Sequence, residues 1–149
     1  MRTVEKQNKK SRLNESLKNS GMKLTRQRKL VYDTLLEKLD HPTAEDLFFR
    51  ARKKQPEISM ATVYNCLEAL VKCGLVKQVK VGKNAVRYCA NLCEHAHFVC
   101  EVCGAIFDLD RDNREKFKNM QIKIPRGFKI HNFEIAIHGT CSDCNILRI

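Results

Sequence analysis

The chain has 149 residues, which suits one domain of ordinary size or two small ones. Its 43% hydrophobic content is enough for a packed core and excludes wholesale disorder. No apolar run approaches the ~20 residues needed to span a bilayer, and the N-terminus has no apolar export segment. We therefore expect a cytoplasmic protein with no membrane partner.

The positive charge lies in the first part of the chain. Lys and Arg number 28 against 17 Asp and Glu, a net charge of +11. Residues 1–88 contain 20 basic and 9 acidic side chains, whereas residues 89–149 contain 8 of each. This asymmetry indicates an anionic partner for the first part, most often nucleic acid. We predict a DNA-binding domain with a basic N-terminal extension at 1–88 and a metal-binding domain at 89–149.

Helical periodicity begins within the basic part. We expect one helix from about Leu13 and a second one that Thr25 caps, because the apolar residues from Leu30 to Leu39 recur at helical spacing. The pair His41-Pro42 ends this second helix, since proline disfavours helical geometry in the residue before it.

Two further helices and a hairpin follow. Thr43 to Asp46 forms a capping-box-like start for the next helix, and Ser59 caps a last helix that Gly74 ends. Period-two alternation on either side of residues 82–84 then predicts a β-hairpin. This order of elements is that of a winged helix-turn-helix, in which the last helix enters the major groove of DNA.

The side chains expected at the DNA lie at the start of the second helix, on the last helix and on the hairpin. They are suited to base-edge or phosphate contacts. The candidates are Arg26, Arg28, Thr62, Tyr64, Asn65, Lys80 and Lys83. Any one lysine is most simply a solvated surface residue, but the charge asymmetry and the element order together favour DNA binding.

Two Cys-x-x-Cys pairs lie in the second part of the chain, Cys100 with Cys103 and Cys141 with Cys144. Each such turn places two sulfurs on one edge of a tetrahedron, so the two pairs together satisfy a structural zinc ion. The alternative is a thiol-disulfide oxidoreductase. In that class the motif opens a helix of a βαβ unit, whereas here a strand is expected after Gly104.

A second set of potential ligands overlaps the first in sequence. His95 and His97 are spaced so that both imidazoles lie on one face of a strand and chelate one ion. Cys89 and Asp108 belong to the same set, and His41 joins it if the two domains close.

Taken together, these motifs occur in the order found in the ferric uptake regulator family, which the chain resembles over about residues 15–145. The motifs are Thr25-x-Gln27-Arg28, His41-Pro42-Thr43-Ala44, Ala61-Thr62-Val63-Tyr64-Asn65, His95-x-His97, Cys100-x-x-Cys103-Gly104 and Cys141-x-x-Cys144. The resemblance implies an α+β protein with an N-terminal winged helix and a small C-terminal α/β dimerisation domain. It implies a homodimeric, metal-dependent repressor of double-stranded operator DNA, without enzymatic activity or a small organic substrate.

The resemblance also implies a role for each ligand set. The four cysteines match a structural zinc site, and the regulatory hinge site is matched by His41, Cys89, His95, His97 and Asp108. The subtype lies between zinc uptake regulators and peroxide stress regulators. Members that sense iron or peroxide have Asp or Glu at the position of Cys89, whereas some zinc-sensing members have a cysteine there. We expect zinc as the regulatory metal, with an iron- or manganese-loaded peroxide sensor as the alternative.

Overall fold

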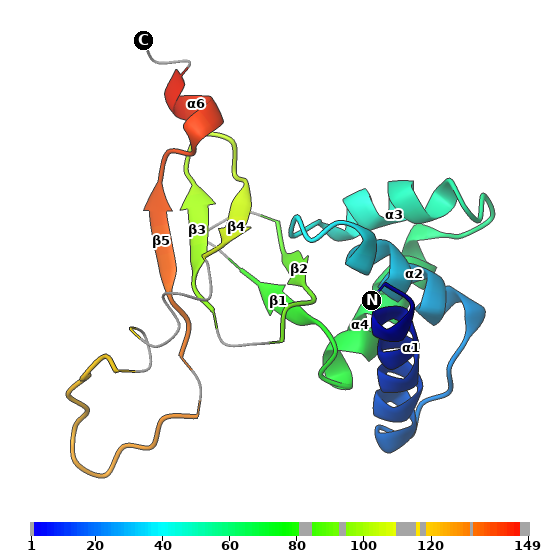
Figure 1. Cartoon of the computed structure of the whole chain (residues 1–149), viewed down its shortest axis with the longest axis horizontal. Coiled ribbons are helices and arrows are strands. Elements are labelled where there is room, and N and C mark those ends of the chain that lie inside the picture. The colour runs from blue at the N-terminus through cyan, green and yellow to red at the C-terminus, as the bar shows by residue number, and fades with distance from the viewer. Residues whose placement is uncertain are drawn as a thin grey trace. The chain divides into compact units, whose positions relative to one another are not determined.

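The computed structural model describes residues 2–80, 85–92, 95–109, 116, 119–131 and 133–146. The chain divides into two compact units, Met1–Leu92 and Cys93–Ile149. Among the described residues, the first unit has four helices and a two-stranded sheet, and the second has a three-stranded sheet and a short helix (Figure 1). These helices and small sheets form the predicted α+β fold. Within the described ranges, no helix has the length and apolar character needed to cross a membrane.

Three helices of the first unit begin at the predicted caps. The helices are α1 (Arg2–Asn19), α2 (Arg26–Glu37), α3 (Ala44–Arg52) and α4 (Met60–Lys72). The side chains of Thr25 and Ser59 accept from the backbone N–H three residues on, and Thr43 forms a full capping box with Asp46. Such caps satisfy N–H groups that have no partner inside the helix. The first helix begins earlier than the predicted Leu13.

The core of the first unit lies among its four helices. Leu17 of α1, Leu35 of α2, Leu47 of α3 and Leu67 of α4 are all fully buried there. Burying one such side chain contributes about 1.5–3 kcal/mol. The N-terminal extension is therefore part of the packed body over its second half.

A short antiparallel ribbon follows α4. Gly74, with a φ of +76°, ends the helix in a conformation that glycine adopts without a Cβ clash. Strand β1 (Lys77–Val79) then pairs with β2 (Arg87–Cys89). The helices and ribbon thus have the predicted order. Lys83, in the predicted turn, lies outside the described residues.

The second helix ends earlier than its periodicity predicts. Leu39, expected on the apolar face, lies beyond the end of α2 and is 62% exposed. The chain leaves helical geometry before His41, whose φ is +52°. A local turn with this conformation overrides the apolar pattern.

The sheet of the second unit has the strand order β4-β3-β5. Its elements are β3 (His97–Cys100), β4 (Ile106–Asp108), β5 (Ala136–Gly139) and α6 (Ser142–Ile146). The central strand β3 runs antiparallel to β4 and parallel to β5. The chain after Gly104 is a strand, as predicted, and not the helix that a thiol-disulfide oxidoreductase motif opens.

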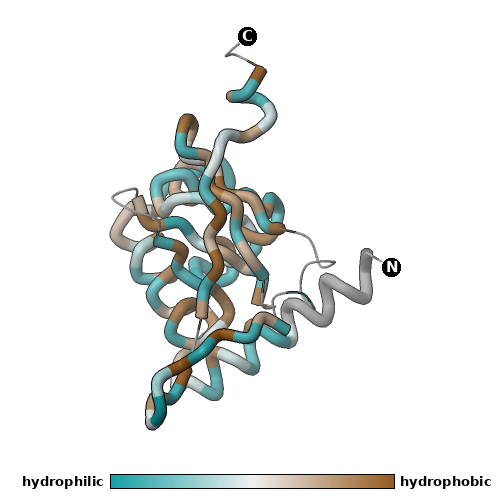
Figure 2. Tube along the Cα trace, turned by 90° about the vertical axis from the view of Figure 1, so that its left-hand side faces the viewer, coloured by the Kyte–Doolittle hydropathy of each residue, from teal (hydrophilic) through white to brown (hydrophobic). Residues whose placement is uncertain are grey.

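Large apolar side chains are exposed in the segment that precedes β5. Figure 2 shows hydrophobic residues recurring along this irregular part of the chain. Between 39% and 71% of each residue is exposed, and the residues are Met120, Ile122, Ile124, Phe128, Ile130 and Phe133. Several large exposed apolar side chains in one segment are typical of a site of protein contact.

The packing of α1 can be tested with Leu17→Ala. Removing a fully buried leucine should lower the free energy of unfolding of the full chain by about 2–5 kcal/mol. Urea unfolding followed by circular dichroism measures this change. Asn14→Ala, at an exposed position of the same helix, is the control, and equal stability of the two variants would show that α1 is not part of the core.

Candidate metal centres

Four cysteines converge at one end of the second unit. Cys100 ends β3, Cys103 lies in the turn that leads to β4, and Cys141 and Cys144 lie just before and within α6. Their sulfur atoms all lie within 4.8 Å of one another. The sulfurs of Cys103 and Cys141 are 3.8 Å apart, far longer than the ~2.05 Å of a disulfide bond.

Hydrogen bonds make these four thiols unequal. Backbone N–H groups of Cys103 and Cys141 lower the pKa of the Cys100 thiol to about 6, and the N–H of Cys141 lies 3.3 Å from that sulfur. Hydrogen bonding to Cys141, together with burial, raises the pKa of Cys144 to about 12. Sulfurs this close resist joint ionisation unless a cation balances their charge. The donor set therefore fits a thiolate-binding ion such as zinc.

An aromatic ring packs against this cluster. Phe98 of β3 contacts the buried cysteines, and the neighbouring strand leaves room for its ring because residue 139 is glycine. A Cβ at Gly139 would lie 3.0 Å from the ring of Phe98. Sequence spacing does not reveal this arrangement, because it depends on the parallel register of β3 and β5.

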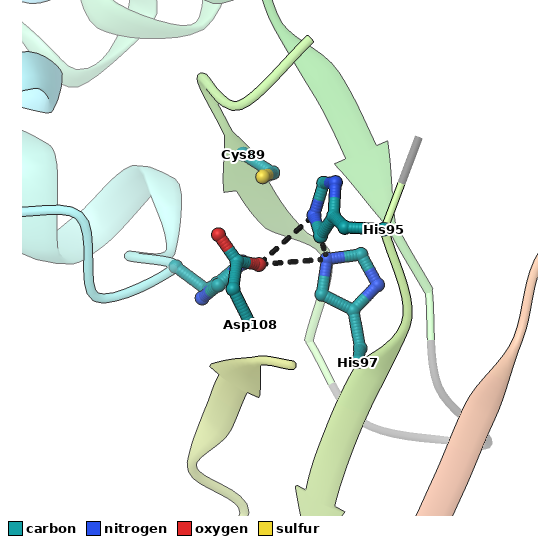
Figure 3. Close-up of side chains that lie close together, drawn as sticks. Cys89, His95, His97 and Asp108 are labelled. Carbon is teal, nitrogen blue, oxygen red and sulfur yellow. Dashed lines mark hydrogen bonds and ion pairs between the residues drawn. The ribbon is translucent and has the colours of Figure 1, made fainter. Parts of the chain in front are cut away.

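A second cluster in the same unit joins two histidines and a carboxylate (Figure 3). His97 and Asp108 are paired in register across β3 and β4, and His95 lies just before β3. The Nε2 atoms of His95 and His97 are 2.8 Å apart, and they lie 2.9 and 3.3 Å from the same Asp108 oxygen. Three potential ligand atoms thus point to one place, and neutral imidazoles with a carboxylate suit a divalent metal ion.

The two remaining predicted ligands, His41 and Cys89, belong to the first unit. His41 is 3% exposed, and Cys89, at the end of β2, is 4% exposed. Their ligand atoms lie within 4.8 Å of each other. The left-handed backbone of His41 is costly for a residue with a Cβ, by about 1–2 kcal/mol, so neighbouring contacts must hold it.

The predicted DNA-contacting residues differ in how free their side chains are. Tyr64 and Asn65 are exposed on α4. Arg26, at the start of α2, and Lys80, just after β1, are exposed too. Thr62 is half-buried, with its hydroxyl 2.8 Å from that of the cap Ser59.

Arg28 is also half-buried, and its guanidinium donates to the backbone carbonyl of Lys23. These bonds give Arg28 and Thr62 a local structural role, whereas the exposed candidates can reach a ligand directly.

Comparison with known proteins identifies the family. The sequence profile of the Ferric uptake regulator family matches residues 19–138. The chain is 35% identical over 146 residues to the ferric uptake regulation protein of Bacillus subtilis, covering 93% of this chain and 96% of that protein. It is 33% identical over 131 residues to the peroxide operon regulator of the same organism, covering 88% and 90%. The solved ferric uptake regulator of Helicobacter pylori covers 91% of this chain and 90% of its own, with a TM-score of 0.66 and 27% identity.

The chain therefore belongs to the ferric uptake regulator family. Members of this family are metal-responsive transcriptional regulators and not enzymes. This membership confirms the resemblance drawn from the sequence motifs, and it excludes the thiol-disulfide oxidoreductase alternative.

Proposed function

We propose that the protein is a homodimeric repressor that binds operator DNA when zinc occupies a regulatory site with ligands from both units. The observation that carries this proposal is the pair of ligand clusters on either side of the unit boundary. His41 and Cys89 belong to the first unit, and the histidine–carboxylate cluster of His95, His97 and Asp108 belongs to the second. The protein would act in the cytoplasm, where DNA is present and thiols stay reduced.

A metal that takes ligands from both clusters would set the angle between the units. In a dimer, two recognition helices reach successive major grooves only when they are about 34–36 Å apart. Metal binding would select this spacing, and without metal the angle would vary and the affinity for DNA would fall. The coupling is reciprocal, so operator DNA would tighten metal binding by the same factor.

Exposed apolar residues support dimerisation through the second unit. Phe128 is 71% exposed, Ile122 57% and Ile130 56%, and water is a poor environment for so many large apolar side chains in one segment. A second copy of this chain would cover them and bring two DNA-binding units into one particle.

Cys89 is the residue that favours zinc. A thiolate is a soft ligand that prefers zinc, whereas the carboxylate found at this position in iron- and peroxide-sensing members is hard and suits iron(II) or manganese(II). Zinc has no redox chemistry of its own. With His95 and His97, Cys89 supplies three ligands, and His41 or Asp108 completes a tetrahedron.

A peroxide-sensing repressor loaded with iron or manganese is the second candidate. Its support is the retention of His41 and Asp108, which gives five potential ligands of which four are nitrogen or oxygen donors. The identity to the peroxide operon regulator of Bacillus subtilis points the same way. In this case iron would promote oxidation of a ligand, and Cys89 itself can be oxidised.

We assign a structural zinc ion to the four-cysteine cluster, and Cys103→Ser and Cys144→Ser test it. Each variant should lose one zinc per subunit and dissociate the dimer, because metal-binding free energy is also folding free energy here. Elemental analysis and light scattering measure both effects. The control is Cys73→Ser, outside the cluster. Retained zinc with an unchanged dimer mass in both test variants would contradict the assignment.

DNA binding should depend steeply on salt. Lysines and arginines displace counterions condensed on DNA. The logarithm of the binding constant should therefore fall linearly with the logarithm of the salt concentration, with a slope of about −0.9 per phosphate contacted. Lys80→Ala should weaken binding to operator and random DNA about equally, whereas Tyr64→Ala or Asn65→Ala should reduce discrimination between them. Fluorescence anisotropy over a salt series measures these effects. An affinity that does not change with salt would mean that the basic surface is only solvated.

The regulatory metal is tested with Cys89→Asp, and Cys89→Ser is the matched control. DNA binding is titrated with zinc, manganese or iron(II) in metal buffers. For the native chain, the ratio of the free zinc concentration to the free iron(II) concentration that activates DNA binding should be lower than the Irving–Williams order alone predicts. Cys89→Asp should shift the ratio toward iron or manganese by about tenfold or more. Cys89→Ser removes the thiolate without supplying a hard oxygen anion, so it should weaken zinc activation without that shift.

If Cys89→Asp leaves the order in which the metals activate DNA binding unchanged, Cys89 is not a ligand of the regulatory site and the zinc proposal is wrong. Peroxide-dependent release of DNA from the iron-loaded native chain, at metal levels that reproduce repression, would favour the peroxide sensor instead.

A further inference from the structure

Contacts from two separate elements hold the backbone of His41. Among the described residues, His41 is the one non-glycine residue with a positive φ. A side-chain-bearing residue keeps this conformation when its surroundings leave it no alternative. The residues on both sides of His41, and its own carbonyl group, are engaged by α3 and β2.

The contact from α3 is an ion pair in fork geometry. Arg50 donates from Nη1 and Nη2 to the two carboxylate oxygens of Asp40, over 2.9 and 2.6 Å. Two parallel charge-assisted bonds fix orientation as well as distance. Although partial burial acts to raise it, the pKa of Asp40 is lowered by the hydrogen bond and charge of Arg50. The residue before His41 is thus tied to a helix of the packed core.

The contact from β2 reaches His41 itself. Arg87 donates from Nη1 to the His41 carbonyl oxygen over 3.1 Å, across 46 residues of sequence. The next residue of β2, Tyr88, donates its N–H to the Pro42 carbonyl over 3.0 Å. The strand ends at Cys89, so the strand that carries one proposed metal ligand also holds the backbone of the other.

We propose that Arg87 and Arg50 are positioning residues for the regulatory metal. Both arginines hold the backbone of His41 so that its imidazole lies near the Cys89 thiol before the metal binds. This inference rests on the proposed function, because it requires His41 to be a ligand. If the segment around His41 is already ordered, metal binding does not have to supply the free energy of ordering it. Neither arginine touches the metal, and each acts through His41.

The test measures zinc affinity of the full chain, with its structural zinc retained and without DNA, by competition with a chelator. Arg87→Ala and Arg50→Ala should each weaken binding at the regulatory site by about 10–100-fold. Arg87→Lys should recover part of the loss, because the His41 carbonyl needs a single donor. Arg50→Lys should recover less, since an ammonium group lacks the fork geometry.

Matched controls separate positioning from general loss of charge. Arg52→Ala removes an exposed arginine of α3 that stacks on Phe48, whereas the ion-pair partners of Asp40 among the described residues are Arg50 and Lys38. Lys72→Ala removes an exposed positive charge from the last turn of α4. Both should leave zinc affinity within twofold of the native chain.

A double-mutant cycle gives the decisive readout. If Arg87 acts through His41, His41→Ala combined with Arg87→Ala should bind zinc as weakly as His41→Ala alone. A general structural role would instead give additive losses. Asp40→Asn, which keeps the side-chain volume, replaces Arg50→Ala if that variant fails to fold.

Three outcomes separate this inference from the proposed function. Weaker binding by His41→Ala, with native affinity in Arg87→Ala and Arg50→Ala, would overturn the positioning role alone. Additive losses in the cycle would do the same. Native zinc affinity in His41→Ala would overturn the positioning role and remove His41 from the regulatory site, leaving Asp108 as the fourth ligand of the proposed function.

Discussion

The close approach of four cysteine sulfurs, all within 4.8 Å of one another, is the constraint on which the second unit depends. Its buried cluster around Cys100 is made of cysteines, with Phe98 packed against them. A small sheet and a short helix bury little apolar surface, and small domains often add a metal or disulfides for stability. The same sulfurs lie close together although a long segment of sequence separates the end of β3 from α6. A cation at this point would therefore close a large loop as well as neutralise charge.

The first unit is held together differently. Its four helices bury a set of apolar side chains, mostly leucines and valines, so hydrophobic packing stabilises this unit. The proposed ligands His41 and Cys89 are attached to this body through α3 and β2. Since α4 is packed in the same core, a metal held by these ligands would be rigidly connected to the helix that carries Tyr64 and Asn65.

The two units differ in surface chemistry, since one carries the basic surplus and the other the exposed apolar side chains. The surplus of basic residues lies in residues 1–88, where it favours association with a polyanion. The large exposed apolar side chains of residues 120–133 lie in the second unit, where they favour association with protein. Under the proposed function, metal binding would change the affinity for DNA through the orientation of the units, without altering either surface.

Local signals in the sequence determined where several helices of this protein begin and end. The caps at Thr25, Thr43 and Ser59 and the glycine end of α4 were predictable, because each depends on hydrogen bonds or φ angles within a few residues. The two Cys-x-x-Cys pairs likewise predicted that distant parts of the second unit meet, since thiolates at this spacing share an ion.

Only the tertiary structure decided the early end of α2, the fork between Asp40 and Arg50, and the bond from Arg87 to His41. None of these follows from periodicity. The fork and the bond join residues whose separation in sequence has no relation to a helical turn or a strand repeat, and the apolar pattern continues beyond the last residue of α2. Their positions depend on how α3 and β2 pack, and side chains chosen by long-range packing leave no local pattern in the sequence.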